Sequence, residues 1–223
     1  MSGPRTPRGV AAVEIAILLF DRLTALDAVG PYEVLSRLPG TVVRWVAVAP
    51  GPQRTEGGLG LLADRALSEV LTPDVIVIPG GMGSRLAMRD GEILEWVRTV
   101  HGTTAWTTSV CTGALILGAA GVLKGLRATS HWTQLERLRE FGAHPVSERT
   151  VRQGKVITAS GVSAGIDMGL RLAQLIAGDT IAQAIQLSIE YDPDPPFAGG
   201  SPEKSPAEVV ELVRAAASRA APR

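Results

Sequence analysis

Four continuous apolar runs, spaced along the first half of the chain, constrain its fold more than any other feature of the sequence. They are VEIAILLF (13–20), TVVRWVAVA (41–49), DVIVIPGG (74–81) and TTAWTTSV (103–110). Runs of this length and composition are typical of strands that are buried on both faces of a sheet. Helical patterns lie between them at 28–37 and 91–101. This alternation of strand and helix predicts a mostly parallel sheet with helices on both faces.

The second half of the chain continues this pattern and adds strands late. We expect a helix at 112–120 directly after the fourth strand, and then a short extended piece and a helix that ends at Gly142. The stretch SERTVRQGKVITASG (147–161) holds two β-type runs separated by Gln153-Gly154, which predicts a hairpin. Helices at 163–177 and 178–190 complete the core.

The two ends of the chain differ in composition from this core. Residues 1–11 are rich in proline, arginine and glycine and predict a flexible leader, and residues 12–191 form a single α/β domain. At 223 residues the chain is long enough for one well-buried core. Residues 192–223 begin with the Pro/Gly-rich DPDPPFAGGSPEKSP (192–206) and end in an amphipathic helix at 206–219. We expect this helix to pack on the domain or on a dimer partner.

The charge balance favours a small-molecule partner. Lys plus Arg and Asp plus Glu both number 22, so there is no basic field to attract nucleic acid or an anionic membrane. No apolar run approaches the roughly 18 to 20 residues that span a bilayer, and the amino-terminal apolar segment is broken by Glu14 and lacks a cleavage signal. The single cysteine cannot form an internal disulfide. These features predict a soluble, cytoplasmic protein.

Cys111, the only cysteine, is the first candidate for chemistry. It follows the fourth strand and precedes the small residues Thr112, Gly113 and Ala114, which a sharp strand-to-helix turn requires. This arrangement resembles the nucleophile elbow, in which a side chain at the apex of the turn projects into a cleft. A helix amino terminus favours the thiolate, so we expect a lowered pKa. Alternatively, Cys111 is a small buried hydrophobe, as many free cysteines are.

Asp27 lies on the same edge of the predicted sheet, in LTALDAVGPYEVL (23–35) after the first strand. Aspartate is a good N-cap and Pro31 is tolerated in a first turn, so a helix start explains the stretch. A carboxylate that faces a thiol across a cleft also supplies acid–base catalysis beside a nucleophile. Both interpretations fit the sequence.

Glycines and a histidine complete the candidate site. Gly80 and Gly81, in VIPGGMGS (77–84), allow close approach of the backbone and could offer an amide to an anionic intermediate, although a tight turn explains them equally well. His131 lies twenty residues after Cys111 in the chain. It is a candidate base for the thiol, or else a structural residue near the site. The spacing of the three histidines predicts no metal site. Tyr32, Trp106 and Trp132 are candidates for lining a substrate pocket.

Several of these stretches, taken in order, resemble the ThiJ/PfpI superfamily and most closely its isonitrile hydratase branch. They are LDAVGPYEVL, IPGG, TSVCTGALILGAAGVLKGLRATSHW, GVSAGIDMGLRLA and IEYDPDPPFAGGSP, which together extend from about Val13 to Pro206. The cysteine elbow and the DxxGPxE stretch are shared with several branches, including sensor domains of AraC-type regulators. The EYxPxPPFxxGSP stretch is more discriminating.

The resemblance implies a flavodoxin-like three-layer α/β sandwich that forms a homodimer. It implies that Cys111 is the nucleophile, Asp27 the acid–base carboxylate and Thr112 a hydrogen-bonding neighbour, with the amide of Gly81 facing the cysteine. The implied reaction converts an isonitrile and water to an N-substituted formamide through a thioimidate on Cys111, without a metal or organic cofactor.

Two other functions remain open from the sequence. A glyoxalase-like or other cysteine-dependent activity would use the same thiol. A non-catalytic sensor domain would also share the elbow, but it requires a DNA-binding module, and only about 30 residues follow the core, which is too few for two helix-turn-helix units.

Overall fold

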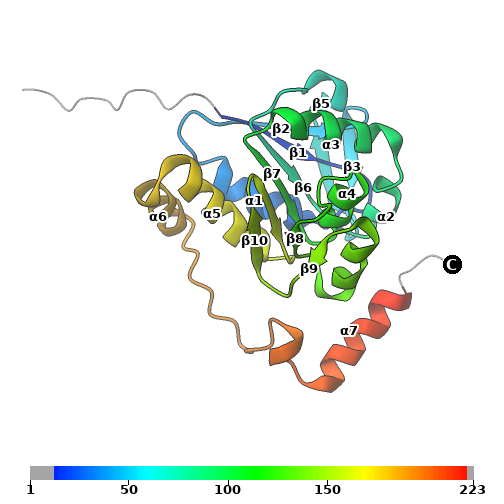
Figure 1. Ribbon diagram of the computed structural model, residues 1–223. Coiled ribbons are helices and arrows are strands. Elements are labelled where there is room, and N and C mark those ends of the chain that lie inside the picture. Colours follow the sequence, from blue (N-terminus) through cyan, green and yellow to red (C-terminus); the bar gives the residue numbers. More distant parts are fainter. Residues whose placement is uncertain (1–12, 220–223) are drawn as a thin grey trace, which may run out of the picture.

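The computed structural model describes residues 13–219, so the predicted leader at 1–11 and the last residues, 220–223, lie outside the described part. At its centre is a seven-stranded sheet in the order β10-β11-β7-β6-β1-β2-β5 (Figure 1). The strands are β1 (Glu14–Leu18), β2 (Val42–Ala47), β5 (Arg65–Ala66), β6 (Val75–Ile78), β7 (Trp106–Val110), β10 (Thr150–Gln153) and β11 (Val156–Ala159). Every described pairing in this sheet is parallel except that of β10 with β11. The four predicted strands and the late hairpin are confirmed.

Helices cover both faces of the sheet. On one face α1 (Ala25–Leu35) packs against α5 (Ala164–Ala177), which in turn contacts α6 (Asp179–Ser188). On the other face α3 (Gly91–Thr103) packs against α4 (Gly113–Ala119), with the short α2 (Ser84–Ala87) beside α4. Right-handed crossovers place α1 and α3 on opposite faces, because the chain moves from β1 to β2 in one direction and from β6 to β7 in the other. The three-layer α/β sandwich is confirmed.

This reversal of direction creates the position for a site. β1 pairs with β2 on one side and with β6 on the other, so the connections that leave β1 and β6 diverge at their carboxyl ends. Ligands bind in the crevice at such a switch point in open parallel sheets. Asp27, Gly80 and Cys111 follow β1, β6 and β7, and therefore reach the same edge.

Three local features differ from the expected pattern. A hairpin of β3 (Gly51–Arg54) and β4 (Gly60–Ala63) was not predicted, because its residues are too mixed in polarity to show a strand period. The helix before Gly142 is a 3₁₀ helix, η2 (Trp132–Phe141), although it ends at Gly142 as expected. Helix α1 begins at Ala25 with Thr24 as its N-cap, so Pro31 lies inside the helix and not in its first turn.

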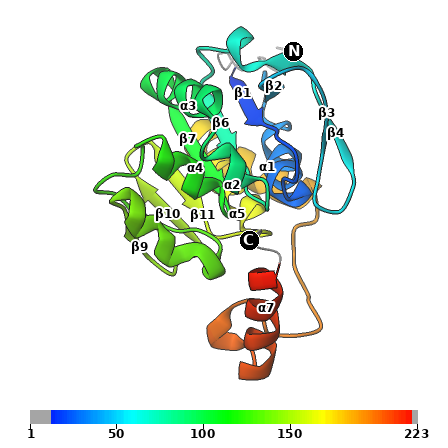
Figure 2. The same cartoon turned by 90° about the vertical axis from the view of Figure 1, so that its right-hand side faces the viewer.

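The remaining short elements are the two-stranded sheet of β8 (Arg127–Ala128) and β9 (His144–Pro145), and the 3₁₀ turns η1 (Leu67–Glu69) and η3 (Pro202–Lys204). After α6 the chain runs as an extended segment to α7 (Ala207–Arg219), which lies below the domain, apart from the main body over most of its length (Figure 2). Near its carboxyl end α7 contacts the domain, where the Arg214 guanidinium lies 5.6 Å from the centre of the Trp132 ring.

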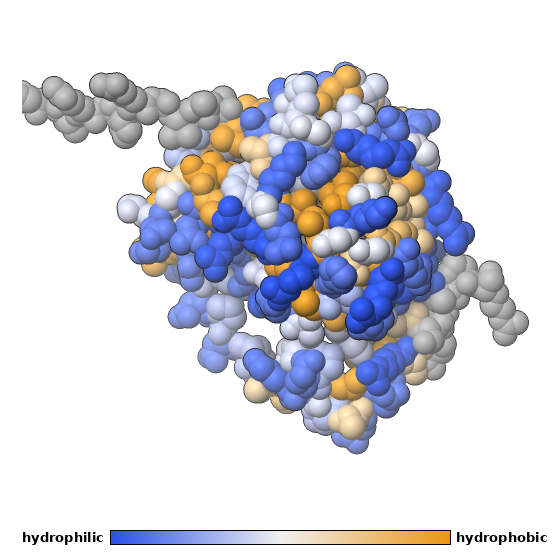
Figure 3. Space-filling model, viewed as in Figure 1, coloured by the Kyte–Doolittle hydropathy of each residue, from blue (hydrophilic) through white to orange (hydrophobic). Residues whose placement is uncertain are grey.

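The surface seen in Figure 3 alternates between hydrophilic side chains and small apolar areas, with a hollow between the domain and the segment that leads to α7. Among the described residues, no helix is both long and apolar enough to cross a membrane.

Candidate active site

A small cavity opens at the carboxyl ends of β1, β6 and β7, and Cys111 lies in its wall. Its volume is about 280 Å³, near the lower end of the roughly 300–1,000 Å³ that is usual for ligand pockets. Thr24, Glu56, Gly81, Met82, Ser84, Arg85, Cys111, Thr112, Leu115, His131, Thr133, Gln134, Arg137, Val162 and Ala217 line it. A cavity of this size fits a compact substrate.

Cys111 adopts the strained elbow conformation that its neighbours predicted. Its φ of 58° is in the left-handed region, which non-glycine residues rarely occupy and which costs on the order of 1–3 kcal/mol. Two hydrogen bonds fix its backbone: its amide donates to the Ala159 carbonyl at 3.0 Å, and its carbonyl accepts from the Ser130 hydroxyl at 3.0 Å. The residue is 5% exposed: it packs with the hydrophobic core and also lines the cavity.

Glycines allow other backbone segments to approach the elbow closely. A Cβ at Gly113 would lie 2.0 Å from the Ile78 carbonyl oxygen, and a Cβ at Gly161 would lie 2.9 Å from Cβ of Cys111 and 3.2 Å from its sulfur. Gly161 and Ser130 were not identified from the sequence. The reason is that each belongs to a segment far along the chain, and only the tertiary structure brings it to Cys111.

Asp27 is completely buried, does not itself line the cavity and is not the N-cap of its helix. It lies in the first turn of α1, after the N-cap Thr24, and its side chain is completely buried. Oδ2 accepts a hydrogen bond of 3.0 Å from the Gly80 amide. Oδ1 is buried without a hydrogen-bond partner among the described residues. The N-cap interpretation is therefore wrong, and one oxygen of this carboxyl is left available for chemistry.

The ionisation of Asp27 and Cys111 is coupled. Burial raises the pKa of Asp27 from 3.8 to about 7, against the lowering effects of the Gly80 amide and the Cys111 thiol. Burial also raises the pKa of Cys111 well above its usual value, the charge of Asp27 raises it further, and the Thr112 amide lowers it in part. The expected low thiol pKa is thus contradicted, because desolvation outweighs the helix amides. Near neutral pH Asp27 is therefore partly ionised while the Cys111 thiol keeps its proton, so Asp27 is the more acidic member of the pair.

Thr112 connects the cysteine elbow to the glycine loop after β6. Its Oγ1 accepts from the Gly81 amide at 2.9 Å and lies 3.0 Å from the Ser84 hydroxyl, which donates to it. Gly81 has a φ of 122°, and a Cβ there would lie 2.4 Å from the Thr24 amide nitrogen. The amides of both Gly80 and Gly81 thus already have acceptors within the protein, in Asp27 and Thr112. A role for either amide in binding an anionic intermediate stays a prediction, and the Thr112 amide is the donor that interacts with the sulfur.

His131 and Glu56 form another part of the cavity wall. His131 Nδ1 lies 2.8 Å from Oγ1 of Thr133 at the start of η2, and burial lowers its pKa below 6.5. Glu56 stands on the turn of the unpredicted β3–β4 hairpin, where its carboxylate accepts a hydrogen bond from the Met82 amide. Its charge raises the pKa values of both Asp27 and His131, so it is close to both groups.

The expected aromatic lining is absent from the described cavity wall. Tyr32 packs on Trp45, Trp106 lies beneath the Arg152 guanidinium, and Trp132 lies beside His131 without lining the cavity itself. The wall is formed instead by small apolar, hydroxyl-bearing and charged residues, together with Gln134 and His131.

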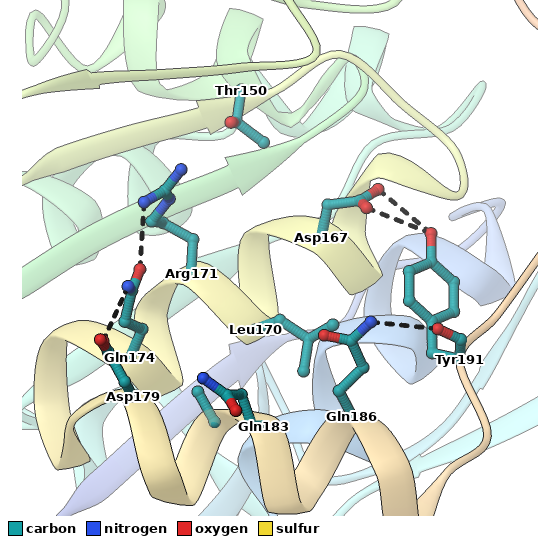
Figure 4. A pocket seen from close by; sticks show the side chains of 10 residues that line it. Thr150, Asp167, Leu170, Arg171, Gln174, Asp179, Gln183, Gln186 and Tyr191 are labelled. Atoms are coloured by element: carbon teal, nitrogen blue, oxygen red, sulfur yellow. Dashed lines mark hydrogen bonds between the residues drawn. The ribbon is translucent and has the colours of Figure 1, made fainter.

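A second hollow, of about 450 Å³, lies between α5 and α6 and has a different character. Its side chains are mostly amides and charged groups, and Tyr191 donates a hydrogen bond to Asp167 across its rim (Figure 4). It contains no thiol and no group paired as Asp27 and Cys111 are. Among residues 13–219, which include every histidine and the cysteine, no group of three or more potential metal ligands is present.

Comparisons with known proteins agree on this architecture. The sequence profile of the DJ-1/PfpI family matches residues 13–175. The isonitrile hydratase of Pseudomonas putida is 43% identical over 211 residues, which are 95% of this chain and 91% of that protein. A crystal structure of a ThiJ/PfpI family protein from Pseudomonas syringae superposes with a TM-score of 0.92 at 37% identity, covering 94% of this chain and 88% of the other.

A transcription regulator shows a weaker similarity. The HTH-type regulator CdhR of Pseudomonas aeruginosa is 26% identical over 176 residues, which are 77% of this chain and 52% of the regulator. The similarity covers about half of that protein.

Proposed function

The chain belongs to the DJ-1/PfpI family, and from this premise we propose that it hydrates isonitriles, converting R–N≡C and water to the formamide R–NH–CHO. The observation that carries the proposal is the buried Asp27–Cys111 pair, in which Cys111 lines a small cavity and Asp27 lies behind it, completely buried. An isonitrile needs a nucleophile and a proton at one carbon atom. This pair supplies both from adjacent side chains. The high identity to an isonitrile hydratase over nearly the whole chain supports the same reaction.

In the first half of the reaction, the Cys111 sulfur attacks the terminal carbon of the isonitrile. The raised pKa of Cys111 keeps the thiol protonated, so the ionised fraction of Asp27, whose pKa is about 7, accepts the thiol proton on Oδ1 as the carbon–sulfur bond forms. Asp27, with a pKa of about 7, then donates this proton to the same carbon. The product is a thioimidate, R–N=CH–S–Cys111, and no charge remains on the carbon.

In the second half, water adds to the thioimidate carbon. Asp27 accepts one proton from the water as the carbon–oxygen bond forms and passes it to the nitrogen, which becomes N–H. Asp27 then takes the second proton, from the new hydroxyl group, as the C=O bond forms and the carbon–sulfur bond breaks. The formamide leaves, and the sulfur receives this second proton from Asp27. Substrate, water and product balance without an oxidant or reductant, so the proposal includes no cofactor.

The neighbours of the pair hold it in place during these steps. The Gly80 amide fixes Oδ2 of Asp27, which leaves Oδ1 directed to the chemistry. The Thr112 amide stabilises negative charge on the sulfur when it leaves. His131 contributes to the shape and polarity of the wall. The homodimer implied by the resemblance is part of the proposal, and light scattering over a range of concentrations tests it.

Incubation with an isonitrile in D₂O tests the reaction directly. We expect a formamide whose formyl carbon bears deuterium, because Asp27 delivers a solvent-exchanged proton there, and a transient adduct on Cys111 by intact mass spectrometry. Release of a formamide without Cys111 modification, or with Cys111→Ala still active, would refute the mechanism. Competition between an isonitrile and methylglyoxal separates hydration from a glyoxalase-like activity at the same thiol.

A further inference from the structure

The wall of the Cys111 cavity contains a cation that the proposed chemistry does not use. Arg85, on α2, lines the cavity and is only partly exposed. Among the described residues it forms no salt bridge and its guanidinium makes no hydrogen bond. The other arginine of the wall, Arg137, has side-chain partners, so Arg85 is the arginine of the described lining whose guanidinium is free.

The position of Arg85 ties it to the nucleophile. The preceding residue, Ser84, donates a hydrogen bond to Oγ1 of Thr112, which is adjacent to Cys111 in the chain. The backbone of Arg85 is therefore anchored close to the elbow. Cys111 and Arg85 line the same cavity, which measures only about 280 Å³. When the isocyano carbon is bonded to the Cys111 sulfur, a group a few bonds further along the substrate is therefore within reach of the Arg85 side chain.

The other charged groups of the wall already have partners. Glu56 accepts from the Met82 amide, and Arg137 donates to Gln134 and contacts Glu140 on its own helix. Met82, Leu115 and Val162 supply the apolar surface between them. A guanidinium that is partly desolvated beside apolar walls gains most from a carboxylate, which it binds through two parallel hydrogen bonds.

We propose that the substrate is an isonitrile whose substituent carries a carboxylate, which Arg85 binds while Cys111 attacks the isocyano carbon. This inference rests on the proposed function and adds the substrate class. Such a compound is an amino acid whose amino group is replaced by an isocyano group. Its hydration gives an N-formyl amino acid, so a deformylating hydrolysis is the class of reaction that consumes the product.

A pair of probes that differ in one charge tests the proposal: β-isocyanopropanoate and the neutral β-isocyanopropanamide. We expect wild-type kcat/KM to be higher for the acid on the order of 10- to 100-fold, as for a hydrogen bond to a charged group. In Arg85→Gln this ratio should fall to near one, and Arg85→Lys should restore part of it. Arg89→Gln, which removes an exposed arginine that does not line the cavity, is the matched control and should keep the wild-type ratio.

A second readout separates this inference from the proposed function. The rate at which a thiol reagent alkylates Cys111 is measured in the presence of N-formyl-β-alanine or of its amide. These are the hydration products of the two probes, so they report binding without requiring turnover. Protection by the acid alone, lost in Arg85→Gln, supports the carboxylate site even if neither isonitrile is hydrated, in which case the proposed function fails. Equal rates for the two isonitriles together with equal protection by the two formamides would overturn the carboxylate site whatever the enzyme's activity. A wild-type ratio retained in Arg85→Gln would also overturn it.

Discussion

Replacing Asp27 by asparagine should change how the stability of the protein depends on pH, as well as its activity. The folded state raises the pKa of Asp27 from 3.8 to about 7 by burying it. Between these values the folded protein binds a proton that the unfolded chain has lost, so the wild-type free energy of unfolding falls as pH rises through this window. Asparagine is neutral at every pH and removes this dependence.

The magnitude follows from the difference in pKa. One pKa unit corresponds to about 1.4 kcal/mol, so the free energy of unfolding of the wild type relative to Asp27→Asn should fall by about 4 kcal/mol between pH 4 and pH 8. Asp27 is completely buried, which means that solvent screening does not reduce this figure. A constant offset is also expected, because the asparagine NH₂ replaces an oxygen that has no partner. The offset does not alter the slope.

Urea unfolding of both proteins at several pH values from 4 to 8 measures this slope, below the range in which Cys111 titrates. The control is Glu33→Gln, which removes a carboxylate from the exposed face of the same helix, where its side chain is 49% exposed. We expect the control to run parallel to the wild type. Turnover of an isonitrile by Asp27→Asn should be lower by about 100-fold or more. Parallel stability curves for wild type and Asp27→Asn would refute the argument that this carboxyl is buried and protonated near neutrality.

Other changes around the pair test separate parts of the site. Cys111→Ala should abolish turnover and leave the protein folded, as monitored by circular dichroism, whereas joint loss of fold and activity would favour a packing role. Asp27→Asn should lower the pH at which Cys111 becomes alkylated, because the opposing charge is gone, and an unchanged midpoint would place the two groups apart. Gly161→Ala should destabilise by about 1–3 kcal/mol and impair turnover, since the new Cβ lies 2.9 Å from that of Cys111. Gly51→Ala, at a similar positive φ (136° against 124°) but with open space around it, is the control for backbone strain. Thr112→Val should cost about 1–3 kcal/mol by leaving the Gly81 amide without its acceptor, and Thr112→Ser should recover most of that loss in thermal unfolding.

The sheet and the elbow could be predicted because their signals are local. Apolar runs identify the buried strands, and the small residues after Cys111 indicate the sharp turn that its φ of 58° confirms. Asp27 was placed on the correct edge because parallel strands bring their carboxyl ends together. Asp27 does lie at the start of the helix, but its interpretation as the N-cap was wrong because Thr24, three residues earlier, is also a capping residue type and is the actual N-cap.

The rest of the site depends on contacts between distant segments. Gly161, Ser130 and Glu56 reach Cys111 or Asp27 from a loop after β11, from the end of β8 and from a hairpin without a strand period. The direction of the thiol pKa was predicted wrongly for a related reason. A helix amino terminus is visible in the sequence, whereas the degree of burial that outweighs it is a property of the packed fold.

The left-handed backbone of Cys111 also bears on how this protein can change over evolutionary time. Glycine occupies that conformation without the steric penalty that every side chain with a Cβ incurs. A Cys111→Gly replacement would relieve this strain but remove both a buried side chain and the proposed nucleophile. The backbone of this residue therefore favours glycine, whereas the proposed reaction requires the thiol.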